Sequence, residues 1–284
     1  MKDLGIGVNA WVWTSPFDRQ AVGLIGRAAQ MGFDAFSIPV ESPELIDVPA
    51  ILKAREEHAI RLNMTVAFGS DRDLASDDHT LRQNSLTYMK QCMVLAEQLD
   101  TPVLVGPAYS CVGKRRKLCD EQRKVEWDRA VSGLRTLGDM AAQHGVVVGI
   151  EPLNRFETDL VNTAAQAVQM IRDVNSSQIK VHLDTFHMHI EEKSIYDAIV
   201  SVGDDLVGID ASESDRGTPG EGQVDWLGLA RALQEIDFRG DCTIESFTPD
   251  CEMIADAAAI WRPLAPSQDY LAQRGQVFLS DLLK

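Results

Sequence analysis

Four acidic residues stand where a short apolar segment ends. The apolar segments cover residues 146–150, 179–183, 206–209 and 242–244, and the acids that follow them are Glu151, Asp184, Asp210 and Glu245. In a barrel of parallel strands, the carboxyl ends of all strands open onto one face. Ionised carboxylates gathered there repel one another and resist burial unless a divalent cation neutralises them. One acid alone is typical of a solvated loop, but four at corresponding strand ends predict a metal site.

The elements that position these acids follow from the alternation of apolar and helix-periodic segments. Strand-like runs occupy residues 4–12, 35–40, 62–67, 103–105, 146–151, 179–184, 206–210 and 242–245. Segments with apolar residues three and four positions apart, which is typical of amphipathic helices, occupy residues 21–31, 81–99, 127–144, 164–174, 227–236 and 268–283. Gly32 and Gly145 are predicted to end helices. This repetition indicates the α/β class and a single (β/α)8 TIM barrel domain over residues 1–284.

The charge balance bears on the kind of partner. The 284 residues carry 43 acidic against 27 basic side chains, for a net charge of −16. Nucleic-acid affinity draws on clustered Lys and Arg, so this balance argues against a nucleic-acid partner. The acidity itself is typical of solubility and indicates no particular function. The one basic run, residues 114–117, is interpreted as a solvated loop or a helix start.

Two further features bear on the compartment. The start Met1-Lys2-Asp3-Leu4 lacks the basic and apolar segments of a secretory signal, and no stretch has the length and apolar character of a membrane span. The five cysteines are scattered without CxxC spacing, which predicts reduced thiols rather than disulfides or a structural zinc site. We therefore expect a cytoplasmic protein without a membrane partner.

Two more polar side chains follow the fifth predicted strand. Glu157 and Arg155 lie in the loop that follows Glu151. From this position the strand-end carboxylate of Glu151 can reach a metal, while the side chains of the loop can reach a substrate. The alternative for Arg155 is an ion pair with Glu157, since exposed pairs of this kind are common and individually weak.

Three histidines cluster at the sixth predicted strand. His187 falls in the expected loop beyond the strand and is the functional candidate. Alternation places His182 on the same face as Asp184, so His182 is interpreted as a core histidine inside the barrel. His189 is interpreted as a structural polar contact.

Three segments of the chain resemble those of a known enzyme family. Residues 151–157, 182–187 and 214–220, read as EPLNRFE, HLDTFH and SDRGTPG, are similar to those of the ketose 3-epimerases. These are the D-tagatose and D-psicose (allulose) 3-epimerases, which are xylose isomerase-like barrels. The resemblance extends over nearly the whole chain.

The resemblance implies one divalent ion, manganese, magnesium or cobalt with manganese favoured, held at Glu151, Asp184, Asp210 and Glu245. It implies that Glu151 and Glu245 are the catalytic pair, one removing a proton from C3 of a free ketose and the other returning a proton to the opposite face through a cis-enediolate. It also implies that Glu157, His187 and Arg216 bind the substrate oxygens, and that the protein is a homo-oligomer, a dimer or a tetramer.

Elementary chemistry supports the same reading. A proton beside a ketone is too weakly acidic for a carboxylate base unless a Lewis acid polarises the neighbouring oxygens. Two bases on opposite faces of the carbon permit inversion, whereas a single base favours transfer or return with retention.

The chain departs from the family at one position. Asp210 stands where the family has a histidine ligand. The extra negative charge is expected to weaken Lewis acidity, to raise the proton affinity of Glu151 and Glu245, and to favour magnesium, manganese or calcium over zinc or copper.

Several other functions remain open. A lyase that acts on a 3-keto-glycoside would use the same acid–base pair, and a sugar-binding paralogue weakened by Asp210 would keep the site without efficient turnover. A phosphodiesterase acting on abasic DNA, as in the related endonuclease IV fold, needs several histidines on the rim for three zinc ions, and few are placed there.

Overall fold

The computed structural model describes residues 4–284 as a closed barrel of parallel strands. The residues Met1 to Asp3, which entered the argument against a secretory signal, lie outside the described residues. The strands occur in chain order around the barrel: β1 Leu4–Asn9, β2 Ala35–Pro39, β3 Arg61–Thr65, β4 Val103–Gly106, β5 Val147–Ile150, β6 Ile179–Asp184, β7 Leu206–Ala211 and β8 Gly240–Ile244. The prediction of a (β/α)8 TIM barrel is confirmed.

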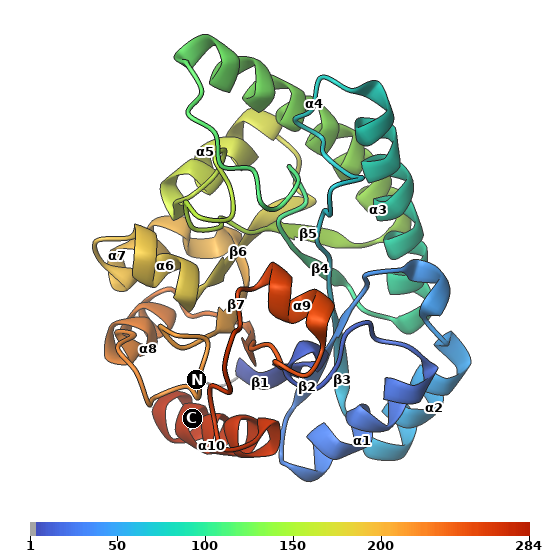
Figure 1. Cartoon of the computed structure of the whole chain (residues 1–284), viewed down its shortest axis with the longest axis vertical. Helices are drawn as coiled ribbons and strands as arrows, with labels where there is room; N and C mark the ends of the chain where they lie inside the picture. The colour runs from blue at the N-terminus through green and yellow to red at the C-terminus, as the bar shows by residue number, and fades with distance from the viewer. Residues whose placement is uncertain (1–3) are drawn as a thin grey trace.

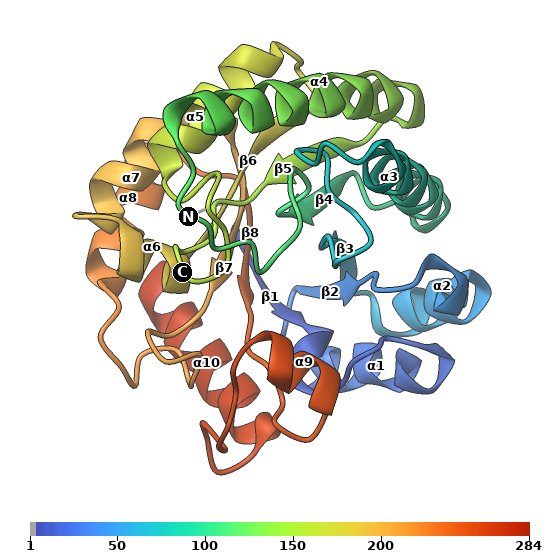
Figure 2. The ribbon, with the colours of Figure 1, turned by 45° about the horizontal axis from the view of Figure 1, so that its top comes forward.

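Helices surround the strands as an outer layer (Figures 1 and 2). They are α1 Gly23–Gln30, α2 Val48–His58, α3 His79–Leu99, α4 Asp120–His144, α5 Ala164–Val174, α6 Thr185–Glu191, α7 Ile195–Val202, α8 Trp226–Glu235, α9 Glu252–Ala257 and α10 Gln268–Leu283. The last helix, α10, lies between α8 and α1 (Figure 1), and the Gln276 amide donates to the backbone oxygen of Gly32 after α1. This contact joins the end of the chain to its first helix.

The strands and the longer helices expected from the sequence occur in the structure in the same order, with several differences in their bounds. Helix α4 begins at Asp120 rather than at residue 127, and α6 lies where a loop was expected. The first strand ends at Asn9, and Ala10–Val12 forms a 3₁₀ turn instead of continuing the strand. The turn begins there because the Asn9 side chain accepts a hydrogen bond from the backbone N–H of Trp11 at 3.0 Å. Gly145 ends α4 in the left-handed conformation, with φ of +68°, as predicted.

The basic run lies in the loop before α4 and is only partly solvated: residues 115–117 are exposed, as interpreted, and Lys114 is not. Lys114 is largely buried and pairs with Asp73 at 2.8 Å and with Glu126 at 3.0 Å, while Arg116 pairs with Glu126 and Asp159. The loop after β4 is thus tied to the start of α4 and is not simply solvated. Within residues 4–284, no helix combines the length and apolar character needed to cross a bilayer, and all five cysteines are free thiols.

Candidate active site and metal centre

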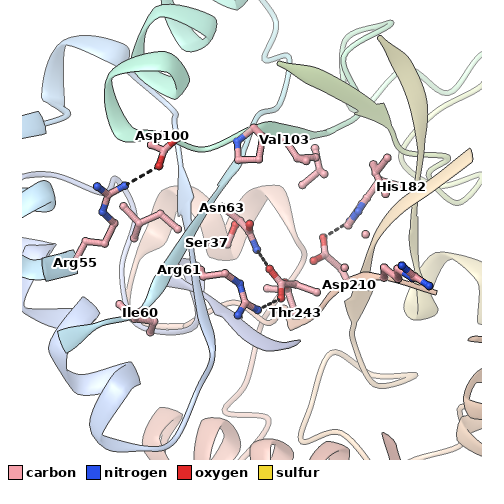
Figure 3. A pocket seen from close by; sticks show the side chains of 18 of the residues that line it. Ser37, Arg55, Ile60, Arg61, Asn63, Asp100, Val103, His182, Asp210 and Thr243 are labelled. Atoms are coloured by element: carbon pink, nitrogen blue, oxygen red, sulfur yellow. Dashed lines mark hydrogen bonds and ion pairs between the residues drawn. The ribbon is translucent and has the colours of Figure 1, made fainter. Parts of the chain in front are cut away.

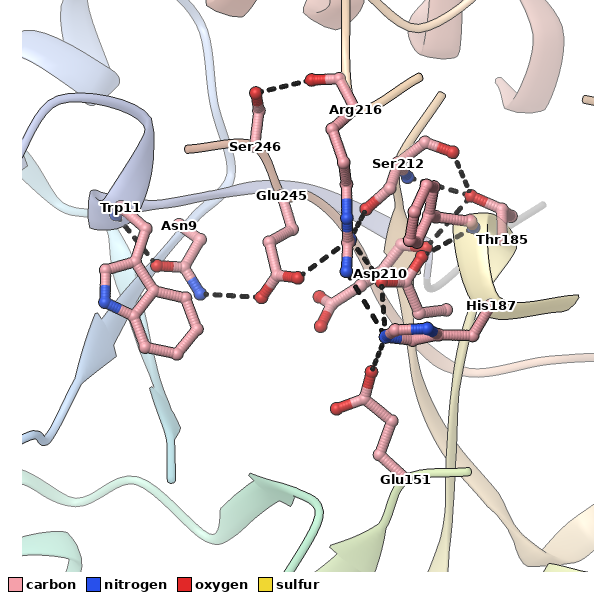
Figure 4. Close-up of polar contacts among 12 residues, drawn as sticks. Asn9, Trp11, Glu151, Thr185, His187, Asp210, Ser212, Arg216, Glu245 and Ser246 are labelled. Carbon is pink, nitrogen blue, oxygen red and sulfur yellow. Dashed lines mark hydrogen bonds and ion pairs between the residues drawn. The ribbon is translucent and has the colours of Figure 1, made fainter. Parts of the chain in front are cut away.

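The four predicted acids lie at one end of the barrel and are all buried, with exposures of 1–5%. Asp184 is the last residue of β6 and pairs in register with Asp210 of β7. Glu151 directly follows β5, and Glu245 directly follows β8. Figure 4 shows the Glu151 and Glu245 side chains pointing into the same space from different strands. The four acids that were predicted from their positions at the ends of strands therefore lie together in the structure.

The acids are not left without partners, and the first partner is Arg216. Its Nη1 donates to Asp184 Oδ2 at 2.5 Å, to Ser212 Oγ at 2.7 Å and to Glu245 Oε2 at 3.1 Å. Burial works against the charge of this guanidinium, but Asp184 and Glu245 outweigh it and raise the pKa of Arg216. One internal cation thus neutralises part of the acidic cluster.

The second partner is a histidine that was interpreted as structural. His182 of β6 lies inside the barrel, and its Nε2 is 2.8 Å from Oδ2 of Asp210. Both side chains are 3% exposed. The interpretation of His182 as a buried barrel histidine is consistent with this position, but its contact with Asp210 makes it part of the acidic cluster. The alternation of side chains along β6 placed it on the correct face and was the available signal.

His187 also lies against the cluster, but from a different element than expected. It belongs to helix α6 rather than to a loop, because the side chain of Asp184 caps that helix at the backbone N–H of Phe186. His187 Nε2 is 3.6 Å from Glu151 Oε1 and 3.7 Å from Asp184 Oδ2. Burial, and then the nearby charge of Arg216, lower the pKa of His187 to about 3, so the imidazole is neutral at physiological pH.

The two glutamates share the electrostatic signature of an acid–base pair. Burial raises the pKa of Glu151 well above its usual value of 4.5, and the charges of Glu245, Asp184 and Asp210 raise it further. Burial and the charge of Asp210 likewise raise the pKa of Glu245, although Arg216 opposes this. Strongly shifted carboxyl groups in a buried cluster mark a candidate site for proton transfer.

The loop after β7 is built to hold Arg216 in place. Arg216 has a positive φ of +63°, which costs conformational energy for a residue with a side chain. The surrounding contacts fix this backbone, since Arg216 N–H donates to the Glu213 carbonyl at 2.8 Å and Ser246 Oγ donates to the Arg216 carbonyl at 2.6 Å. The guanidinium also lies over the rings of Phe186, at 4.2 Å, and Phe247, at 5.0 Å.

Glu213 organises the same loop from within. Its carboxylate accepts hydrogen bonds from the loop backbone and from Trp226 Nε1 at 2.9 Å. Burial alone would raise the pKa of Glu213, but these hydrogen bonds outweigh it and lower the pKa. No pattern in the sequence singled out Glu213, because its role depends on a loop that folds back on itself.

The remaining predicted substrate contact, Glu157, lies at the edge of the cluster. Asn154 Nδ2 donates to Glu157 Oε1 at 2.8 Å and lies 2.8 Å from His187 Nδ1, so this amide holds two of the candidate substrate-binding residues. Arg155 instead pairs with Glu191 at 2.9 Å and is largely exposed. The structure therefore separates Arg155 from both Glu157 and the acidic cluster.

Two residues near the end of β1, Asn9 and Trp11, border the site. Asn9 donates from Nδ2 to Thr65 Oγ1 at 3.1 Å and approaches Glu245 Oε1 at 3.5 Å. Trp11, drawn beside it in Figure 4, packs on Phe247 with ring centroids 5.6 Å apart. An indole and a phenyl ring next to polar groups suit the apolar C–H face and the hydroxyls of a sugar.

The donor set fits a divalent cation. Oxygen and nitrogen atoms of Glu151, Asp184 and His187 lie within 4.8 Å of one another, and so do those of Glu151, His182 and Asp210. A mixture of carboxylate and imidazole ligands suits Mn²⁺ and Co²⁺, whereas Mg²⁺ prefers the carboxylate oxygens. Burial first, and then the neighbouring carboxylates, raise the pKa of Glu151 and Glu245, and a bound cation would oppose the second of these effects.

Comparison with known proteins adds independent information. Residues 25–266 match the family model described as Xylose isomerase-like TIM barrel. The chain is 29% identical to an L-ribulose 3-epimerase from Methylomonas sp. over 98% of this chain and 97% of that protein. It is 29% identical to a D-psicose 3-epimerase from Ruminiclostridium cellulolyticum, over 93% and 90% of the two chains.

A solved structure agrees with these relatives. The D-allulose 3-epimerase from Methylomonas sp. in complex with D-allulose superposes with a TM-score of 0.92 at 28% identity, covering 98% of this chain and 97% of that one. The resemblance to ketose 3-epimerases, and with it the prediction of a related enzyme, is confirmed by these relatives.

Proposed function

Because the chain belongs to the Xylose isomerase-like TIM barrel family, we propose that it is a divalent-metal-dependent epimerase that inverts C3 of a free ketose. One observation carries the proposal: Glu151 and Glu245, on separate strands of the barrel, both have a strongly raised pKa and border one buried cluster. The curated relatives that act on ketoses at C3 support the same assignment.

In the proposed reaction, one glutamate removes the proton from C3 and the other returns a proton to the opposite face. A carboxylate placed beside the carbon can accept the proton, and a protonated carboxyl group on the other side can donate one. A bound cation held by Glu151, Asp184, Asp210 and Glu245 would supply Lewis-acid polarisation of the sugar oxygens. Two bases on opposite sides of the carbon account for inversion rather than retention.

Other side chains of the site would bind and orient the sugar. We assign Glu157, His187 and Arg216 to the substrate oxygens. His187 is neutral and offers either a donor or an acceptor, and Asn154 holds both His187 and Glu157 through its amide. Trp11 and Phe247 would cover the apolar face of the ring and exclude water.

Free sugars fit this site better than sugar phosphates. The only cation within hydrogen-bond distance of the acids, among residues 4–284, is Arg216, and Asp184 and Glu245 already engage it. Two residues of the basic run are likewise engaged by acids: Lys114 pairs with Asp73 and Glu126, and Arg116 pairs with Glu126 and Asp159. We also propose that the protein is cytoplasmic and forms a homo-oligomer, for which light scattering on the purified protein is the test.

Product analysis tests the proposed reaction. The protein is first freed of metal with a chelator. It is then incubated with D-psicose, L-ribulose or a 3-keto-glycoside, with and without added Mn²⁺, and the products are separated by chromatography. We expect the C3 epimer of a free ketose, formed only with added metal. Release of the aglycone from the keto-glycoside without epimer would instead assign the lyase reaction, and binding of ketose without any product would assign a sugar-binding protein.

A further inference from the structure

His182 occupies a position from which it can reach the proposed cation. It lies two residues before Asp184 on β6, so both side chains point to the barrel interior, with His182 one layer deeper. Figure 3 shows its imidazole directed at the carboxylate of Asp210 on the neighbouring strand. This contact links a buried nitrogen donor to the group of acids above it.

Glycines on both neighbouring strands provide the room for this imidazole. A Cβ atom added at Gly208 of β7, the register partner of His182, would lie 2.8 Å from His182 Nδ1. A Cβ atom added at Gly149 of β5 would lie 3.2 Å from the Cβ of His182. Any larger residue at position 208 would push against the ring, so Gly208 is what lets the imidazole lie across β7 and reach Asp210.

The separation of the donor atoms suits shared coordination. His182 Nε2 and Asp210 Oδ2 are 2.8 Å apart. One ligand atom from each of Glu151, His182 and Asp210 lies within 4.8 Å of the other two. Two donors bound at right angles to one ion, each about 2.1 Å from it, are about 3.0 Å apart. The observed pair is therefore close to the spacing that two ligands of one ion require.

The far nitrogen of the ring has no partner in the described part of the chain, although His182 lines a cavity beneath the site. His182 Nδ1 is buried and has no hydrogen-bond partner among residues 4–284. His182, Gly208 and Asp210 line a cavity of about 580 Å³ that continues past Asn63 and Asp241 toward the amino ends of the strands (Figure 3). A histidine that binds a metal through one nitrogen usually donates the N–H of the other to a partner, and the described residues supply none for Nδ1.

We propose that His182 is a nitrogen ligand of the divalent cation, supplied by β6 from below the carboxylates. The proposal rests on the cation site of the proposed function. A neutral imidazole adds affinity without adding to the negative charge of the cluster, and it shifts preference toward cobalt and manganese over magnesium.

Pulsed electron paramagnetic resonance of the Mn²⁺-loaded protein tests the assignment directly, because it detects a nitrogen nucleus bound to manganese. We expect nitrogen modulation in the wild type, its loss in His182→Gln, and its retention in His187→Gln and in the control His189→Gln. We expect Gly208→Ala, which keeps His182 but crowds its ring, to weaken the same signal.

Equilibrium dialysis with Co²⁺ and Mg²⁺ gives a second readout. We expect His182→Gln to weaken Co²⁺ binding by roughly 10- to 100-fold and Mg²⁺ binding by less. Manganese binding with nitrogen modulation that persists in His182→Gln, or that disappears only in His187→Gln, would overturn the assignment of His182 while leaving the cation site intact. Failure of the wild type to bind any of the three ions would overturn the proposed function and this inference together.

Discussion

The guanidinium of Arg216 lies 2.5 Å from the carboxylate of Asp184, at the centre of the buried acidic cluster. The same nitrogen is 3.1 Å from Glu245, so one arginine bridges acids from two separate strands. Strand-end acids without a cation are therefore partly neutralised by the chain itself. A divalent ion and Arg216 would share the task of balancing the cluster, and this arrangement leads to the first prediction.

We expect Arg216→Met to destabilise the metal-free protein by about 3–5 kcal/mol, because it leaves Asp184 and Glu245 buried without their cation. Added Mn²⁺ should restore much of the lost stability by neutralising the same acids. Chemical denaturation with and without Mn²⁺ measures both effects. Arg155→Met, which removes the exposed pair with Glu191, is the matched control and should change stability little. Equal effects of the two substitutions would contradict a central role for Arg216.

We expect Glu151→Gln and Glu245→Gln each to lower kcat by about 10²–10⁴-fold, the range that a positioned acid or base contributes. Neither change should destabilise the metal-free protein at neutral pH. The pKa of each carboxyl group is raised in the folded state, so the folded state binds more protons than the unfolded state. The free energy of unfolding of the wild type therefore falls as the pH rises above 4.5. Thermal unfolding between pH 5 and pH 8 checks this, and a Gln variant that retains kcat would remove that glutamate from the mechanism.

We expect Glu213→Gln to destabilise the loop after β7 by about 1–3 kcal/mol at neutral pH, since charged hydrogen bonds to the backbone and to Trp226 are weakened. The lowered pKa of Glu213 means that the unfolded state binds the extra proton, so this stabilisation is present above pH 4.5 and is lost as pH falls further. The wild type and the variant should therefore converge in stability in acid. Asp237→Asn, at an exposed position, is the control, and a difference that persists unchanged in acid would contradict the assignment.

We expect Asp210→His to change both the metal preference and the rate of ketose epimerisation, because it removes one negative charge and the contact with His182. The smaller charge should strengthen Lewis acidity and shift preference away from magnesium. Epimerase activity measured at increasing concentrations of each metal ion tests this. Asp204→Asn, at an exposed position just before β7, is the control and should change neither property. If neither the activity nor the metal preference changes, Asp210 is not a ligand.

Much of the barrel was predictable because strand and helix patterns are local. The acids Glu151, Asp184, Asp210 and Glu245 were found because parallel strands end at one face of the barrel. The position of His187 was only partly predictable, since the capping of α6 by Asp184 turned the expected loop into a helix.

The partners of the acids could not be predicted from spacing. Arg216 reaches Asp184 and Glu245 through a loop whose path depends on the internal hydrogen bonds of Glu213. The contact of His182 with Asp210 depends on Gly208, on a neighbouring strand, leaving room for the ring. Such contacts join residues far apart in sequence, and no local period records them. That residues 1–284 form one domain stays a prediction.

Reaction of the Mn²⁺-loaded protein with a ketohexose in deuterated water tests the central claim most directly. Transfer between two carboxyl groups that exchange with solvent predicts one deuterium at C3 of the newly formed epimer at early times and none at C1. We expect Glu151→Gln and Glu245→Gln each to lose this deuterated epimer. Nuclear magnetic resonance of the sugar reads these positions. A C3 epimer formed without solvent deuterium, or deuterium at C1 together with an aldose product, would contradict inversion by two opposed carboxylates.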